Sequence, residues 1–163
     1  MKRAIQLMSI VVLGMIMVAC SSSSANFDPE EEKKKATEVM EGVLTSFEDQ
    51  EKLAEGATRD ESNQIAWDKI KEKNSDALSD DLSNEEEKRL LYILTVNKAE
   101  DTANGGTKSN LHFNQNTKIK DTIFNEEDKT FNFDIEMFGV DNEIITLKKQ
   151  EDAWKITKVT EPE

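Results

Sequence analysis

Cys20 is the only cysteine in this chain of 163 residues. It ends a largely apolar run, from Leu7 to Ala19, that follows the basic start Met1-Lys2-Arg3. Because there is no second cysteine, an intrachain disulfide and a metal site built from paired cysteines are excluded. Whatever fold the chain adopts must therefore be stabilised by its hydrophobic core rather than by covalent cross-links.

The residues around Cys20 also predict where the protein resides. A basic start, a short apolar stretch and a small residue before a cleavage point are typical of a secretory signal peptide. The four residues Met17-Val18-Ala19-Cys20 resemble the lipobox of bacterial lipoproteins. This resemblance implies cleavage between Ala19 and Cys20 and attachment of a diacylglyceryl group to the cysteine thiol.

Two alternatives to a lipoprotein signal are a transmembrane anchor and an ordinary secretory signal with an incidental cysteine. The apolar run is shorter than the roughly 20 residues that a membrane-spanning helix needs. The single cysteine stands at the one position that the lipobox requires. We therefore expect a signal peptide over 1–19 and a protein held on the extracytoplasmic side of a cell membrane by two acyl chains.

The charge of the chain restricts its partners. It contains 34 acidic and 21 basic residues, for a net charge of −13, and loss of Lys2 and Arg3 with the signal peptide makes it more negative still. Binding to nucleic acid needs clustered lysine and arginine. This composition argues against a nucleic-acid partner and against charge-driven binding to anionic lipid, so the lipid group must supply the membrane attachment.

Past the signal peptide, we expect a serine-rich tether over 20–27 and one domain over 28–160. Three helix starts are predicted in this domain, because Asp28, Thr58 and Ser83 each stand three residues before a glutamate. Apolar residues spaced by three and four predict a first helix that stops near Gly56 and a third helix that includes Val96. Residues 100–110 are rich in glycine and polar residues and predict a loop.

After residue 110 the apolar period changes from helical to alternating, as Phe131, Phe133 and Ile135 show. Short turns between the alternating segments predict an antiparallel meander, with a further short strand at 111–113. The predicted fold class is α+β, with about three N-terminal helices packed on one curved antiparallel sheet of four to five strands. The strands of the meander are expected at Ile119–Phe124, 131–137, Glu143–Lys149 and Ala153–Val159.

The closing segment Glu151-Asp152-Ala153-Trp154-Lys155-Ile156, the helical half that ends near Lys98 and the meander from Ile119 resemble NTF2-like domains of bacterial lipoproteins. The resemblance implies a cone-shaped α+β fold with a helical portion in the concave side of a bent sheet. That family includes enzymes, pocket binders and assembly modules, and an assembly factor of type IV secretion systems has a similar fold.

Polar candidates for a site are few. His112 is the single histidine, and its place between Leu111 and Phe113 predicts a solvent-facing strand residue rather than a general base. Asp134 is expected on the wet face of its strand. The spacing of Asp121 predicts that it shares the face of Ile119 and Ile123, which makes it the better candidate for a pocket.

Aromatic candidates are Trp67, Tyr92 and Trp154, which can line a ligand pocket but are more often part of a core. We expect no metal and no cofactor beyond the covalent lipid on Cys20. The expected function is a non-enzymatic binding or assembly module for an envelope or secretion partner. The alternatives are a small hydrolase or isomerase that uses His112 or Tyr92 with Asp121 or Asp134, and a surface exclusion or immunity lipoprotein of a mobile element.

Overall fold

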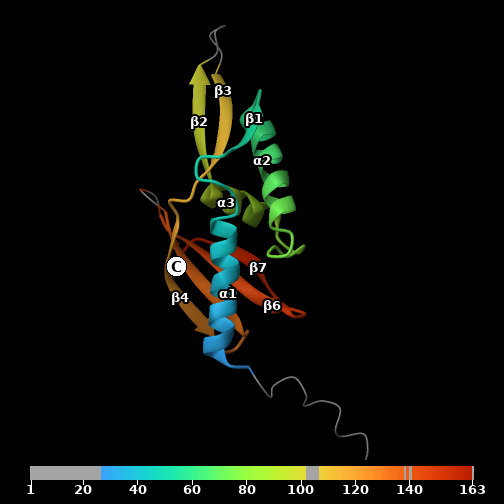
Figure 1. Cartoon of the computed structure of the whole chain (residues 1–163), viewed down its shortest axis with the longest axis vertical. Helices are drawn as coiled ribbons and strands as arrows, with labels where there is room; N and C mark the ends of the chain where they lie inside the picture. The colour runs from blue at the N-terminus through green and yellow to red at the C-terminus, as the bar shows by residue number, and fades with distance from the viewer. Residues whose placement is uncertain (1–26, 102–106, 138, 140, 163) are drawn as a thin grey trace, which may run out of the picture. The chain divides into compact units, whose positions relative to one another are not determined.

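The computed structural model describes residues 27–101, 107–137, 139 and 141–162 (Figure 1). The predicted signal peptide and Cys20 lie outside the described residues. The chain divides into two compact units, Met1–Glu32 and Lys33–Glu163. No helix in the described part of the chain is long and apolar enough to cross a membrane.

The described residues form three helices and seven strands, which confirms the α+β class. The helices are α1 (Pro29–Leu44), α2 (Arg59–Lys73) and α3 (Asn84–Leu94). The strands are β1 (Lys52–Gly56), β2 (Thr95–Asp101), β3 (Thr107–Phe113), β4 (Lys118–Asn125), β5 (Thr130–Glu136), β6 (Glu143–Gln150) and β7 (Ala153–Thr160).

All three predicted helix starts are confirmed. Asp28 Oδ1 accepts hydrogen bonds from two backbone N–H groups of the first turn of α1, at 3.0 and 3.4 Å. The hydroxyl of Thr58 accepts from the backbone N–H of Glu61, and Ser83 forms a complete capping box with Glu86. These side chains satisfy N–H groups that have no partner inside a helix, and so fix where each helix begins.

Two predicted helix ends are wrong. Helix α1 stops at Leu44 rather than near Gly56, and Gly56 closes strand β1 instead. A Cβ atom on Gly56 would lie 2.7 Å from Ser62 Oγ, so the glycine lets β1 approach α2 closely. Helix α3 stops at Leu94, and Val96 lies on β2.

The strands form two antiparallel sheets, so the prediction of one sheet with four to five strands is wrong. Sheet A has the order β1-β3-β2, and sheet B has the order β4-β5-β6-β7. The predicted meander is sheet B and is confirmed. The predicted loop at 100–110 instead contains the ends of β2 and β3, which pair with each other, and residues 102–106 between them lie outside the described residues.

Sheet B carries a continuous apolar face. Phe131, Phe133 and Ile135 are completely buried on β5, and the ring of Phe131 lies 5.1 Å from that of Trp154 on β7. Helix α1 lies against this sheet, as Figure 1 shows, and Lys33 Nζ donates to the backbone oxygen of Thr122 on β4 at 3.5 Å. The buried residues of α1 in the second unit are Ala36, Met40, Val43 and Leu44.

The connector between α2 and α3 is also part of the fold. Leu78 forms a parallel bridge with Ile156, which donates its backbone N–H to Ala77 at 2.8 Å and accepts from Ser79 at 3.0 Å. The outer edge of β7 is therefore paired over this short stretch. This pairing also holds the end of α2 near the turn between β6 and β7, where a hollow opens beside α1.

Candidate functional site

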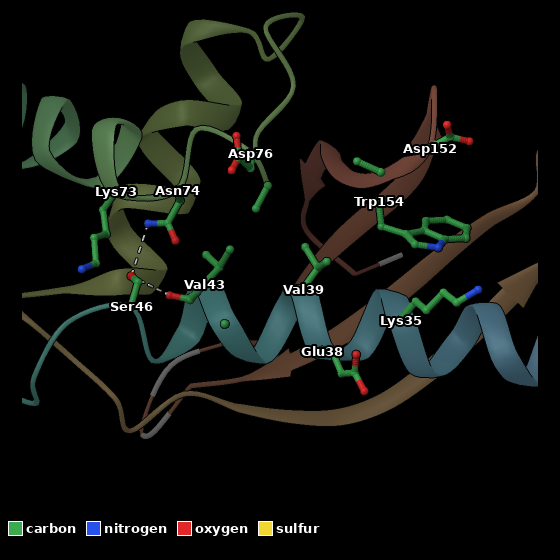
Figure 2. Close-up of a pocket in the computed structure, with 13 residues that line it drawn as sticks. Lys35, Glu38, Val39, Val43, Ser46, Lys73, Asn74, Asp76, Asp152 and Trp154 are labelled. Carbon is green, nitrogen blue, oxygen red and sulfur yellow. Dashed lines mark hydrogen bonds between the residues drawn. The ribbon is translucent and has the colours of Figure 1, made fainter.

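A groove of about 620 Å³ runs along one side of α1 (Figure 2). We call it the α1 groove. Its other walls are the end of α2 with the connector that follows, and the turn between β6 and β7. A volume of this size is within the usual range for ligand sites. It is lined by Lys35, Glu38, Val39, Gly42, Val43, Ser46, Lys73, Asn74, Asp76, Ala77, Asp152, Ala153 and Trp154.

The α1 groove combines an apolar floor with a charged rim. Val43 and Trp154 are buried, and Val39 is half-buried beside them. The rim carries two lysines and three carboxylates, from Lys35, Lys73, Glu38, Asp76 and Asp152. An arrangement of this kind suits an apolar group that enters the groove while charged groups around it stay in water.

Gly42 is the one glycine among the residues that line this groove, and it lies within a helix. It lies in the last turn of α1 with no positive φ, where glycine is less favourable than alanine for helix formation. A Cβ atom at this position would meet no heavy atom within 4 Å, so no close packing requires the glycine. Since neither conformation nor packing accounts for it, what the glycine provides is open space in the groove wall.

One polar joint fixes the inner end of the groove. Asn74 Nδ2 donates to Ile70 O at 2.9 Å, and so helps to cap α2, and it also donates to Ser46 Oγ at 3.2 Å. Ser46 Oγ in turn donates to Val43 O at 3.0 Å, as the dashed lines of Figure 2 show. Asn74 is 7% exposed, so these bonds are shielded from water. The ends of α1 and α2 are thus held in a fixed arrangement.

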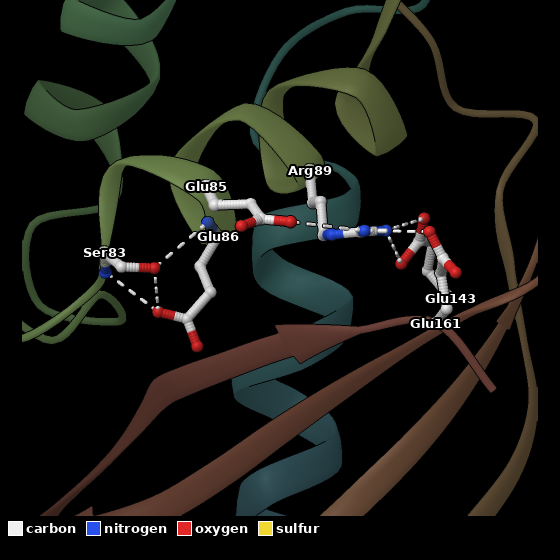
Figure 3. A network of polar contacts seen from close by, with 6 residues as sticks. All are labelled: Ser83, Glu85, Glu86, Arg89, Glu143 and Glu161. Atoms are coloured by element: carbon white, nitrogen blue, oxygen red, sulfur yellow. Dashed lines mark hydrogen bonds and ion pairs between the residues drawn. The ribbon is translucent and has the colours of Figure 1, made fainter. Parts of the chain in front are cut away.

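A second polar cluster joins α3 to sheet B around Arg89 (Figure 3). Its guanidinium contacts Glu143 at 3.2 Å, Glu161 at 2.8 Å and Glu85 at 3.5 Å. The side chain of Glu143 is 9% exposed, whereas those of Glu161 and Glu85 are open to water. Of the three ion pairs, the one with Glu143 is therefore the one in which loss of the partner would matter most.

The charges of this cluster affect one another. Burial raises the pKa of the Glu143 carboxyl above its ordinary value, and the nearby Arg89 opposes this rise. The hydrogen bond with Glu161 raises the pKa of Arg89, so the guanidinium stays charged. The pKa of Glu86 is pushed up by burial, but its hydrogen bonds with Ser83 outweigh this and lower it. The cluster therefore has a structural role: it links α3 to sheet B, and the guanidinium of Arg89 is already bound to three carboxylates.

The structure places Asp121 and Asp134 opposite each other on β4 and β5, but His112 lies on β3 of the other sheet. His112 is half-buried on β3, and its Nδ1 lies 2.8 Å from Gln50 O; since a carbonyl only accepts, Nδ1–H donates. The predicted alternation around His112 is confirmed, because Leu111 and Phe113 are buried. None of His112, Asp121 and Asp134 lines the α1 groove.

The prediction that Asp121 shares the face of Ile119 is wrong. The pairing of β4 with β5 shifts between these two residues, so Ile119 stands opposite Ile135 while Asp121 stands opposite Asp134. A bulge of this kind moves every later side chain to the other face of the sheet. Asp121 is consequently exposed. Asp134 is half-buried on the outer face and pairs with Lys120 at 3.4 Å.

The aromatic candidates lie in two places. Trp154 belongs both to the core of sheet B and to the wall of the α1 groove. Trp67 and Tyr92 line two adjoining hollows between α2 and α3 instead. Sequence reasoning missed Gly42, although a glycine within an apolar helical stripe was the available signal.

Among the described residues, no group of three or more His, Cys, Asp or Glu side chains is arranged to hold a metal ion. Comparison with known proteins adds no family: no family model matches the chain, and neither a curated protein nor a solved structure shows significant similarity to it.

Proposed function

We propose that this protein is a lipid-anchored, non-enzymatic binding module whose α1 groove receives an apolar segment of a protein partner in the cell envelope. The residues around Cys20 support the anchor. The observation that carries the binding role is Gly42, a poor helix former in the last turn of α1 that lines the groove and has open space where a side chain would stand.

The partner has a definite chemistry. The floor of the groove is apolar, so the group that enters it is apolar. The rim has one more carboxylate than it has lysines, and the whole chain has a net charge of −13. A cationic segment is therefore attracted over distance and an anionic one is repelled. The occupant is an apolar side chain or helix face flanked by lysine or arginine.

We also propose that α1 and sheet B correspond to the cone of an NTF2-like domain, with sheet A and α2 as an addition to it. The support is the order of elements, in which a long helix precedes a four-stranded antiparallel meander and lies against its apolar face. This assignment gives the α1 groove the place between helix and sheet that a pocket binder of that family would use.

Titration calorimetry with two defined peptides tests the groove. The probe is an amphipathic peptide of leucine and lysine, and the matched comparison is a peptide of leucine and glutamate. The Leu/Lys peptide should bind, and Gly42→Leu should weaken it at least about tenfold by filling the groove. Glu41→Leu, an exposed neighbour on α1 outside the groove, is the matched control. Equal binding of both peptides, or unchanged binding by Gly42→Leu, would contradict the proposal.

The same variants apply in cells. A photo-crosslinking residue in place of Lys35, on the groove rim, should capture one envelope protein, and Gly42→Leu should abolish that product. The same residue in place of Lys148, exposed on β6 and outside the groove, is the control position. A product that survives Gly42→Leu would place the contact elsewhere.

The anchor is tested separately. Cys20→Ser should prevent metabolic labelling with a fatty acid and move the protein out of the membrane fraction. Labelling that persists in this variant would rule out the lipoprotein assignment and would leave the groove proposal untouched.

A further inference from the structure

A second groove lies between α2 and α3, and the proposed partner does not use it. Two hollows of about 390 and 430 Å³ share Asp60, Asn63, Lys88 and Leu91 in their walls, so we treat them as one and call it the α2–α3 groove. Its position follows from helix periodicity. Lys88, Leu91 and Tyr92 lie on one face of α3, at steps of three and four from Lys88, and Thr95 follows directly at the start of β2.

The α2–α3 groove is amphiphilic rather than apolar. Tyr92 is 51% exposed on its wall, so its ring is open to a ligand. Its polar lining is mostly carboxamide and hydroxyl, from Asn63, Gln64, Asn84, Thr95 and Asn97. Asn63 and Lys88 make no side-chain hydrogen bond with another described residue, so their donors are available to a ligand.

The indole of Trp67 is a second, independent observation at this place. The side chain lines the groove and is 6% exposed, yet its Nε1–H is buried without an acceptor among the described residues. A buried donor without a partner is costly and rare in native proteins. The ring lies under Lys71, whose Nζ is 6.0 Å from the ring centroid and 3.8 Å from Glu87 on α3.

This cover over Trp67 is easily displaced. The side chain of Lys71 is 54% exposed, and an exposed ion pair at 3.8 Å contributes little to stability. A ligand that moves Lys71 aside gains a flat aromatic face, and an oxygen atom of that ligand can accept from the indole N–H. The groove therefore offers two aromatic rings, Trp67 and Tyr92, with amide and hydroxyl groups beside them on α2, α3 and the start of β2.

The charges of the lining decide which ligand fits. Arg59 and Lys88 are balanced by Asp60 and Glu87, so the lining is neutral in a chain of net charge −13. An anion such as phosphate calls for an excess of donors and positive charge, which is lacking. A ligand with many hydroxyl groups, apolar C–H faces and no charge matches both the rings and the amides.

We propose that the α2–α3 groove is a binding site for a neutral carbohydrate, with the rings of Trp67 and Tyr92 against sugar faces and Asn63 and Lys88 donating to hydroxyl groups. This site is separate from the α1 groove, with which it shares no lining residue. It gives the protein a second, saccharide contact beyond the protein partner proposed above.

The experiment is a two-dimensional NMR titration of the soluble Cys20→Ser protein with three neutral trisaccharides: maltotriose, cellotriose and N,N′,N″-triacetylchitotriose. Trigalacturonic acid and inorganic phosphate are the anionic comparators. The chain has two tryptophans, so Trp154→Phe assigns the indole N–H signal of Trp67. At least one neutral trisaccharide should shift that signal saturably, with a Kd of about 1 mM or below.

Variants then locate the site. Tyr92→Ala and Asn63→Ala should each weaken binding at least about fivefold, because each removes one contact to the sugar. Ile65→Ala, on α2 but outside the groove, should leave it unchanged, and so should Gly42→Leu, which separates this proposal from the first. If no neutral trisaccharide binds, if only an anion binds, or if Tyr92→Ala and Asn63→Ala have no effect, the proposal is overturned.

Discussion

The two sheets of this protein differ in what they bury beside their apolar side chains. On β5 of sheet B, Phe131, Phe133 and Ile135 are completely buried and apolar. On β3 of sheet A, Phe113 is completely buried too, but so is Asn110, and neither polar atom of the Asn110 side chain has a hydrogen-bond partner among the described residues. Sheet A therefore buries a polar group that lowers its net contribution to stability.

The largest test of this difference is truncation of one core side chain in each sheet. Phe133→Ala should lower the free energy of unfolding by about 4 kcal/mol, because a fully buried phenylalanine is replaced by a cavity. Leu111→Ala on β3 should cost about 2 kcal/mol, at the low end for leucine, because Leu111 borders the open α2–α3 groove. Urea unfolding at equilibrium measures both, and equal losses would contradict the comparison.

The next effect concerns the joint between α3 and sheet B. Arg89→Ala should destabilise the protein by about 2 kcal/mol near pH 7, because it leaves the carboxylate of Glu143, 9% exposed, without its cation. Arg89→Lys keeps the charge and should recover part of this loss. Unfolding of both variants by urea provides the measurement.

The pH dependence of Arg89→Ala has a definite sign. Burial already raises the pKa of Glu143 in the folded protein above the value of 4.5 that it has when unfolded, and loss of Arg89 raises it further. The folded state then binds a proton more tightly than the unfolded state, so the variant loses stability as pH rises above about 4.5 and regains it below. A loss that is the same at pH 7 and at about pH 3.5 would show that the ion pair is not its cause.

The two sheets also differ in how much of their structure could be predicted from the sequence. Sheet B could be predicted because apolar and polar residues alternate along β5, as Phe131 and Phe133 show, and because short turns connect its strands. Of sheet A, only the short strand at 111–113 could be predicted, from the alternation of Leu111 and Phe113 around His112, because β1 is short and the rest of β2 and β3 is mostly polar. The strands of sheet A form because they pair with strands far away in the sequence, and a local sequence pattern does not show which segments will pair.

The sites were predictable to a smaller extent. The aromatic candidates Trp67, Tyr92 and Trp154 all line grooves, and their role as site residues stays a prediction. Which groove each one lines depends on how the helices pack, which spacing alone does not fix. Asp121 was misplaced because a single-residue bulge in β4 reverses the face of every residue after it, and a bulge leaves no sign in the alternation.

A smaller effect, of opposite sign, is expected at the buried amide of sheet A. Asn110→Val should stabilise the protein by about 1 kcal/mol, because it removes two polar atoms without partners and places a β-branched residue in a strand. Asn97→Val, at an exposed position on the neighbouring strand β2, is the control and should change stability by less than about 0.5 kcal/mol. Thermal unfolding would detect the difference, and destabilisation by Asn110→Val would mean that the amide is satisfied in solution.

The smallest change in stability is expected from an ion cluster on the surface of sheet A. Glu55 lies 2.6 Å from Lys108 and also contacts Lys52, and hydrogen bonds with these two lysines lower the pKa of its carboxyl to about 2. Because this pKa is below the value of 4.5 in the unfolded chain, the stabilisation is present above about pH 4.5 and is lost as pH falls toward 2. Glu55→Gln should therefore lower the urea midpoint slightly near pH 6 and have no effect near pH 2.

The two ion clusters are thus expected to titrate in opposite directions. Lowering the pH weakens the contribution of Glu55 on sheet A, whereas it relieves the buried carboxylate of Glu143 beside sheet B. They should also differ in salt dependence, since the exposed Glu55 cluster is screened at about 0.5 M NaCl and the buried Arg89–Glu143 pair is screened much less. A Glu55→Gln effect that persists in high salt would place that carboxyl in a shielded site and remove the distinction between the two sheets.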